Sequence, residues 1–317
     1  MAVINSLELL GAIKQNIQKR IIGKDDVIDK ILICLICGGH ALIEDVPGLG
    51  KTTLISALAE STSCSFRRLQ FTPDVLPSDI TGFHMLNIHS GERTFHPGAV
   101  QSQILLADEI NRTGPKTQSA LLQAMQEGEI TVDNETFALP APFLVFATQN
   151  PIEMTGTYPL PEAQLDRFLF RISIGYPDKK HELSILDGNQ KRMQDTRLSP
   201  ICSDRDVLKL QQNLDEVCCV SPVKNYIISI AAATRRHPRI SLGLSPRGSI
   251  ALMRAAMGRA MLSGREFVIP DDVQYAAAPV VAHRLVLAPG AYADGQPPEE
   301  IVQEILTKIP VPGASAS

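Results

Sequence analysis

The chain has 317 residues, which corresponds to about two domains at roughly 150 residues each and excludes a peptide-sized or disulfide-stapled scaffold. Lysine and arginine number 30 and aspartate and glutamate 34, so the net charge of −4 excludes bulk attraction to nucleic acid or to an anionic membrane. Hydrophobic residues make up 44% and charged residues 20%, a composition typical of a folded globular protein.

The first 20 residues lack the basic start, apolar run and cleavage site of a secretory signal, and no stretch has the composition of a membrane-spanning helix. We therefore expect a cytoplasmic protein without membrane insertion, whose six cysteines are thiols. Cys34 and Cys37 have the spacing of a metal or redox pair, but no second pair follows at ligand spacing and their segment is apolar. This favours buried helix thiols, and we extend the interpretation to Cys218 and Cys219.

Hydrophobic periodicity divides the first part of the chain into alternating elements. Helical spacing from Ser6 to about Cys37 is interrupted at Ile22-Gly23, and short apolar runs then alternate with longer helical ones. The expected strands lie at 41–44, 66–70, 103–107, 143–148 and 168–174. The clearest helices between them are expected at 52–60 and 116–126. This alternation predicts an α/β domain over residues 1–177, with a five-stranded, mainly parallel sheet covered by helices on both faces.

The pattern changes after Tyr176-Pro177. Residues 178–197 are polar, so we expect a linker over 178–200, and the periodicity from Ser203 onward is helical. We predict a smaller all-helical domain over 201–310 and a flexible tail at 311–317.

A phosphate-binding loop is predicted directly after the first strand, in the segment Asp45-Val-Pro-Gly-Leu-Gly-Lys-Thr52. Glycines let backbone N–H groups face phosphate oxygens, Lys51 can reach the β and γ phosphates, and the Thr52 hydroxyl can ligate Mg²⁺. The strict pattern has glycine where Asp45 stands, so the first turn of this loop must form differently. The predicted nucleotide contacts in the loop are Pro47, Gly48, Leu49, Gly50, Lys51, Thr52 and Thr53.

A second apolar strand ends in two carboxylates, Asp108 and Glu109. The carboxyl edge of an open α/β sheet is the edge where ligands bind. We predict that Asp108 holds the Mg²⁺ shell and that Glu109 orients and polarises an attacking water. Together with the phosphate loop, these residues predict ATP hydrolysis with ATP and Mg²⁺ as cofactors.

Four segments extend the pattern across nearly the whole chain. They are Asp108-Glu-Ile-Asn-Arg112, Phe146-Ala-Thr-Gln-Asn-Pro151, Pro161-Glu-Ala-Gln-Leu-Asp-Arg-Phe168 and Leu244-Ser-Pro-Arg-Gly248. In these motifs and their order the sequence resembles the AAA+ ATPases and, within them, the MoxR family, whose version of the loop also fits Asp45. The resemblance implies a AAA+ P-loop domain followed by a helical lid domain.

The resemblance also implies further site residues by matching position. Asn150 matches a polar sensor near the γ-phosphate, Arg167 an arginine finger offered to a neighbouring subunit, and Arg247 a second sensor that contacts nucleotide. A guanidinium suits both arginine roles because it stays charged and can bind phosphate in two places. Ile22 and Gly23 match the segment that contacts adenine.

Two insertions in the α/β domain are expected to be hairpins, at about 83–95 and 130–139. They resemble hairpins that line the central pore of related ring ATPases. His84, His89 and His96 have a spacing that fits no common metal site, so we expect solvated or packed side chains there.

The resemblance implies a chaperone-like ATPase that remodels or activates a partner, acting as a homo-oligomer, a hexameric ring, with a von Willebrand factor A domain protein. An alternative is a nucleic-acid motor related to MCM-type proteins, which should present basic residues from its hairpins. The segment Glu129–Leu139 has three acids and no base, so no nucleic-acid partner is expected. A magnesium-chelatase-like subunit is another alternative, whereas a non-hydrolysing switch would not need Glu109, Asn150 and Arg167 together.

Overall fold

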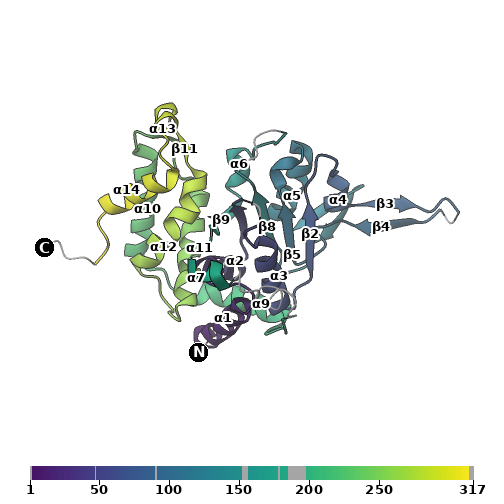
Figure 1. Ribbon diagram of the computed structural model, residues 1–317, viewed down its shortest axis with the longest axis horizontal. Helices are drawn as coiled ribbons and strands as arrows, with labels where there is room; N and C mark the ends of the chain where they lie inside the picture. Colours follow the sequence, from purple (N-terminus) through teal and green to yellow (C-terminus); the bar gives the residue numbers. More distant parts are fainter. Residues whose placement is uncertain are drawn as a thin grey trace.

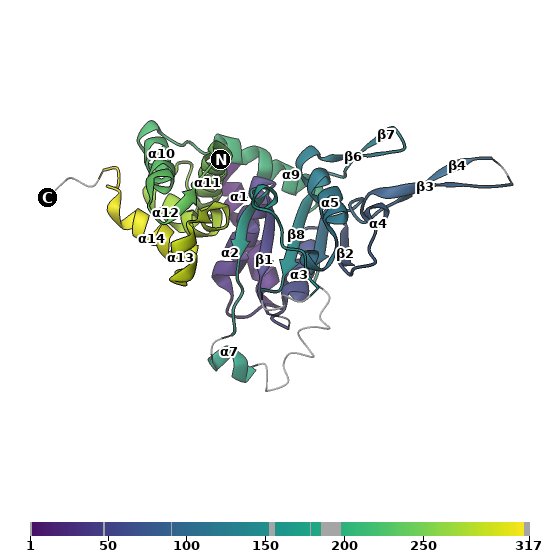
Figure 2. The same ribbon diagram turned by 90° about the horizontal axis from the view of Figure 1, so that it is seen from above.

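The computed structural model describes residues 2–46, 48–89, 91–151, 156–177, 179–184 and 198–313. A central sheet with its helices forms one domain, and a mostly helical lid domain lies beside it (Figure 1). Two hairpins project from the side of the sheet that is farther from the lid (Figure 2). Within the described ranges, no helix is both long enough and apolar enough to cross a membrane.

The helices of the first domain are α1 (Ala2–Gln18), α2 (Asp25–Cys37), α3 (Lys51–Ser61), α4 (Pro77–Thr81), η1 (Ile110–Arg112), α5 (Pro115–Glu127), α6 (Glu162–Leu165) and α7 (Lys179–Ser184). Its strands are β1 (His40–Glu44), β2 (Phe66–Gln70), β3 (Gly82–Leu86), β4 (Arg93–Pro97), β5 (Ile104–Asp108), β6 (Glu129–Val132), β7 (Glu135–Ala138), β8 (Leu144–Gln149) and β9 (Phe168–Ile172). The C-terminal part comprises α9 (Asp204–Asn213), η3 (Leu214–Glu216), α10 (Ser221–Arg236), β10 (Ile240–Leu242), α11 (Pro246–Leu262), α12 (Pro270–Val281), η4 (Ala282–Arg284), β11 (Val286–Leu287), α13 (Pro289–Ala293) and α14 (Pro298–Lys308).

The five-stranded sheet has the order β2-β5-β8-β1-β9, and every neighbouring pair in it is parallel. The α/β prediction is therefore confirmed, and each of the five expected strands is found with ends that differ by no more than two residues. Alternate residues of β1 point to opposite faces, with Ala41 and Ile43 on one side and Leu42 on the other. Apolar residues of α1, α2 and α3 cover the first face, and those of α4 and α5 cover the second.

The lid lies along the β9 edge of the sheet and packs against α2. Gly258 of α11 permits this contact, because a Cβ there would lie 2.9 Å from Ile33 Cγ2 and 3.1 Å from Cys37 Sγ. Arg259 adds a salt bridge of 3.2 Å to Asp29 of α2. The lid is helical as predicted, apart from the short antiparallel pair β10–β11. Helix α7 falls in the range expected to be a linker, and residues 185–197 of that range lie outside the described residues.

The cysteines differ in one respect from the prediction. Cys34 and Cys37 are helix thiols of α2, and burial raises the pKa of Cys37 to about 12. The extension to Cys218 and Cys219 is wrong, because both lie between η3 and α10, where Cys218 is exposed and forms a single β-bridge with Phe267. Pro222 explains the difference: it stands in the first turn of α10, so a new helix begins there.

The hairpins β3–β4 and β6–β7 project on the same side of the domain (Figure 2), and their aromatic side chains contact each other. Phe95 stacks on Phe137 with 4.1 Å between ring centroids, and His84 Nδ1 lies 3.2 Å from Asp133 Oδ2. His96 packs on the ring of Phe83. Among the described residues there is no group of three or more histidine, cysteine, aspartate or glutamate side chains placed to hold a metal.

Candidate active site

A cavity of about 360 Å³ lies at the carboxyl ends of β1, β5 and β8. It brings together residues from the phosphate loop, β2, β5 and β8. The lining residues are Gly48, Gly50, Lys51, Thr52, Thr53, Arg68, Gln70, Asp108, Glu109, Thr148 and Asn150. Most of the predicted ATP and Mg²⁺ residues thus meet in one place, with Leu49 half-buried outside this lining and Pro47 outside the described residues.

The phosphate loop leaves open space in front of its backbone. Gly48 and Gly50 have φ values of +87° and +80°, which only glycine adopts readily, and no atom lies within 4 Å of where their Cβ atoms would stand. Lys51 begins α3 and donates a hydrogen bond to the main-chain oxygen of Asp45. Burial lowers the pKa of Lys51, and the carboxylates of Asp45 and Asp108 oppose that shift.

Asp45 forms the first turn of the loop in a way that glycine cannot. Its Oδ2 accepts hydrogen bonds from Gly175 N at 2.9 Å, from Ile174 N and from Ser173 Oγ at 3.3 Å, so it binds the chain just after β9. Lys24 Nζ donates to the carbonyls of residues 174–176 at 2.7–3.0 Å. The loop is therefore tied to the carboxyl end of β9, and Asp45 has no positive φ that would require glycine.

Restoring the strict pattern with Asp45→Gly is therefore expected to destabilise the protein. The change leaves two buried or half-buried N–H groups and a hydroxyl without their acceptor, at a cost of about 1–3 kcal/mol in the free energy of unfolding. Urea unfolding of the two proteins measures the difference, and Asp45→Asn, which retains an acceptor, should lose less. A variant with glycine that is as stable as the parent would contradict this role.

The two acidic residues at the end of β5 are held by Thr148 of β8. Thr148 Oγ1 donates to Asp108 Oδ1 at 2.6 Å and accepts from Glu109 N at 2.9 Å. Glu109 has a φ of +57°, an uncommon conformation for a residue other than glycine and one that clusters at functional sites. The hydroxyl thus fixes the turn that carries both carboxylates into the cavity.

Three further side chains bind these carboxylates. Arg68 Nη2 donates to Asp108 Oδ2 at 2.7 Å, and Glu109 Oε2 accepts from Gln70 Nε2 at 2.7 Å and from Arg112 Nη1 at 2.9 Å. Arg68, Gln70 and Thr148 were not among the site residues predicted from the sequence. The signal for the first two is their spacing, because residues two apart at the end of a strand share one face of the sheet.

The donor set suits Mg²⁺. Thr52 offers a hydroxyl oxygen and Asp108 a carboxylate, and hard oxygen ligands are those that Mg²⁺ prefers. Asn150, 7% exposed, adds an amide to the same cavity.

The expected adenine segment lies close to the chain that Asp45 holds. Ile22 is 40% exposed, and Gly23 has a φ of +71°, with the ring of His181 from α7 within 2.6 Å of where its Cβ would stand. Any side chain at position 23 would displace that ring. The next residue, Lys24, binds the carbonyls of residues 174–176. Asp45 of the phosphate loop binds residues 173–175, so this short stretch after β9 connects the expected adenine segment to the loop.

Arg167 and Arg247 do not reach the phosphate cavity of their own chain. They line a separate cavity of about 270 Å³ together with His40, the first residue of β1, whereas the phosphate loop follows the other end of that strand. The five residues of β1 span roughly 15 Å, so the two cavities lie at opposite ends of the parallel strands, one at their amino ends and one at their carboxyl ends. Arg167 Nη1 donates to Leu122 O at 2.7 Å, and its buried Nε has no hydrogen-bond partner in the described part of the chain.

The positive charge at this second edge affects a neighbouring histidine. Burial lowers the pKa of His40 to about 4, and Arg247 contributes to the shift. His40 is thus neutral, and its Nδ1 accepts from Val145 N at 3.0 Å. The arginines are the charged groups that this cavity can offer to an anion.

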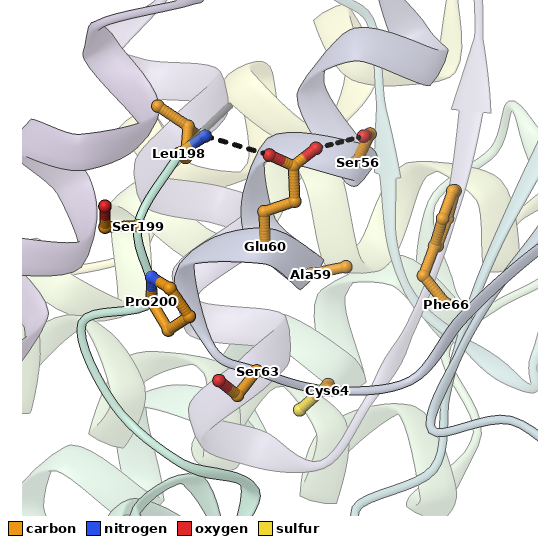
Figure 3. A pocket seen from close by; sticks show the side chains of 9 residues that line it. All are labelled: Ser56, Ala59, Glu60, Ser63, Cys64, Phe66, Leu198, Ser199 and Pro200. Carbon is orange, nitrogen blue, oxygen red and sulfur yellow. Dashed lines mark hydrogen bonds between the residues drawn. The ribbon is translucent and has the colours of Figure 1, made fainter. Parts of the chain in front are cut away.

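A larger cavity of about 550 Å³ lies at the C-terminal end of α3 (Figure 3). Its carboxylate, Glu60, accepts from Ser56 Oγ at 3.0 Å and Leu198 N at 3.0 Å, as drawn there. Arg20 also binds both oxygens of Glu60 at 2.7 Å. These contacts give Glu60 a structural role, because it joins α3 to the turn that follows α1 and to residue 198.

Comparison with known proteins supports a nucleotide-binding role for the phosphate cavity. The sequence model of the ATPase family associated with various cellular activities (AAA) matches residues 40–170, and that of the AAA lid domain matches residues 232–305. The chain is 38% identical to Chaperone MoxR1 of Mycobacterium tuberculosis over 95% of its own length and 81% of that protein. This chain is a member of the MoxR family of AAA+ ATPases.

Two more comparisons cover nearly the whole MoxR chain. It is 49% identical to an uncharacterised Bacillus subtilis protein, YeaC, over 96% of this chain and 95% of that one. A crystal structure of a Cytophaga hutchinsonii protein, described as a candidate ATPase, superposes with a TM-score of 0.91 at 37% identity, covering 98% of this chain and 97% of the other. The P-loop fold with its lid is thus shared with the Cytophaga hutchinsonii protein over nearly the whole of both chains.

Proposed function

We propose that this MoxR protein hydrolyses ATP and uses the energy to remodel or activate a partner protein. The observation that carries the proposal is the convergence of Lys51, Thr52, Asp108, Glu109 and Asn150 on one cavity. Thr52 and Asp108 would hold Mg²⁺, which supplies charge neutralisation on the phosphates when bound. Lys51 and the N–H groups of the loop would bind the phosphate oxygens.

Within this proposal Glu109 is the group that acts on water. Its carboxylate can polarise a water molecule for attack on the γ-phosphate, and Asn150 can place that water. Gln70 and Arg112 both bind Glu109 Oε2, so they hold the carboxylate in the cavity and leave Oε1 for the water.

The position of the arginines supports a head-to-tail ring. Arg167 and Arg247 line the edge of the sheet opposite to the phosphate cavity, where they are available to the nucleotide of the next subunit. A heterologous interface that repeats around a closed ring brings these two edges together at every contact. We propose a homo-oligomer, with a hexamer as the expected ring.

We propose that the partner is a von Willebrand factor A domain protein. We also propose a cytoplasmic location, because buried thiols such as Cys34 suit a reducing compartment. The chaperone name of a full-length relative supports remodelling over a magnesium-chelatase-like role. A nucleic-acid motor is disfavoured because Asp133 and Glu135 put negative charge on the second hairpin, facing His84 of the first.

The test uses Glu109→Gln with Mg²⁺ and ATP as bait in a native cytosol. We expect ATP-dependent capture of a von Willebrand factor A domain protein, because the variant binds nucleotide without turning it over. Lys51→Ala, which should not bind ATP, is used as the control bait. Equal capture by both baits, or recovery of single-stranded nucleic acid in place of such a protein, would contradict the proposed function.

A further inference from the structure

The lid contains a buried guanidinium, that of Arg284, which does not line the phosphate cavity. Arg284 ends η4, and its side chain is 3% exposed. A buried charge is costly unless it is paired and its donors are satisfied, so its partners indicate what it holds in place.

Most of its hydrogen-bond partners flank Arg167 along the chain, and the other two, Val280 O and His283 Nε2, belong to the lid. Arg284 Nε donates to Asp166 Oδ1 at 2.7 Å, and Nη2 donates to Asp166 O at 3.2 Å and to Phe168 O at 2.6 Å. Nη1 donates to Leu169 O at 3.3 Å. One lid side chain therefore binds the main chain on both sides of Arg167.

Asp166 also connects Arg284 to the helix turn that carries Arg247. The second oxygen of Asp166, Oδ2, accepts from Ser245 Oγ at 3.4 Å, and Ser245 is the N-cap of α11, two residues before Arg247. Gly248 lies in the first turn of that helix, where a Cβ would stand 3.1 Å from Arg284 Cδ and 2.3 Å from Leu244 Cδ1. The glycine leaves room for the aliphatic part of Arg284 beside the turn that carries Arg247.

We propose that Arg284 is a positioning residue: through Asp166 and the main chain of residues 166–169, it sets Arg167 and Arg247 for the nucleotide of the neighbouring subunit. The proposal rests on the proposed function, in which both arginines act across the subunit interface. It assigns to the lid an effect on a site that belongs to the next chain, and none on the phosphate cavity of its own.

Arg284→Lys tests the proposal, because lysine retains the charge but cannot bind the carboxylate and the carbonyls with a planar fork. We expect ATPase activity to fall at least tenfold, since a displacement of about 1 Å in a reacting group costs up to ~100-fold. Nucleotide affinity in the same chain should stay within about twofold. Arg265→Lys is the matched control, because Arg265 forms a bidentate pair with buried Asp272 in the same lid and should retain activity.

Subunit mixing separates positioning from a merely structural role. In an equal mixture with Glu109→Gln, a quarter of the interfaces pair Glu109 of the Arg284→Lys chain with intact arginines of the other, so about a quarter of the parent activity should return. If Arg284 acts only within its own chain, the mixture gives about half the activity of Arg284→Lys alone. Asp166→Asn, which breaks the pair from the other side, should repeat the recovery if Arg284→Lys does not fold.

Full activity of Arg284→Lys, or loss of activity without recovery on mixing, would overturn the inference. The mixture of Glu109→Gln with Arg167→Ala distinguishes this failure from failure of the proposed function. If that mixture recovers and the Arg284→Lys mixture does not, only the positioning role falls. If neither recovers although subunits exchange, the assignment of Arg167 across the interface falls with it.

Discussion

Replacing Glu109 by glutamine is expected to leave ATP binding intact and to lower ATP hydrolysis by about 10²–10⁴-fold, the usual contribution of a positioned general base. The amide keeps the shape of the side chain and can still contact Gln70 and Arg112, but it cannot polarise water. Lys51→Ala is expected to act differently, by weakening nucleotide binding itself.

Fluorescent-nucleotide titration and phosphate release, measured on the same preparations, distinguish the two effects. Glu127→Gln is a suitable control, because Glu127 is an exposed carboxylate at the end of α5. This variant should hydrolyse ATP at the parent rate. Turnover of Glu109→Gln at the parent rate would remove Glu109 from its role.

Arg167→Ala is expected to lower hydrolysis by about 10³-fold or more, as the loss of an arginine finger does in related phosphoryl transfers. Its guanidinium lies at the opposite edge from the phosphate cavity, so ATP binding by the same chain should not change. Arg205→Ala, which removes an exposed arginine of α9, is the control for loss of charge. Undiminished hydrolysis by assembled Arg167→Ala would exclude the finger role.

The sequence was sufficient for those parts of the site that lie close together along the chain. The loop from Gly48 to Thr52 and the pair Asp108-Glu109 each follow a short apolar strand, and parallel strands bring their carboxyl ends to one edge. Strand periodicity and glycine spacing are local signals, so both the sheet and this cavity follow from them.

Contacts between distant residues could not be predicted in the same way. Asp45 binds Ile174 over 129 positions and Arg284 binds Asp166 over 118, and neither pairing leaves a local pattern in the sequence. The separation of Arg247 from the phosphate cavity depends on how the lid packs on α2 and β9, which is a tertiary property. The family resemblance predicts that Arg247 contacts nucleotide, but only the fold shows that Arg247 lies near the start of β1, away from the phosphate cavity of its own chain.

In the proposed ring, each active site is shared between two neighbouring chains, with Glu109 from one and Arg167 from the next. The most direct test of this sharing is the ATPase activity of an equal mixture of Glu109→Gln and Arg167→Ala, after subunit exchange has been verified. With random assembly and independent sites, ½ × ½ of the interfaces are intact, so about a quarter of the parent activity should return. If Arg167 acts within its own chain, every site lacks one group, and a mixture no more active than either variant alone would contradict the claim.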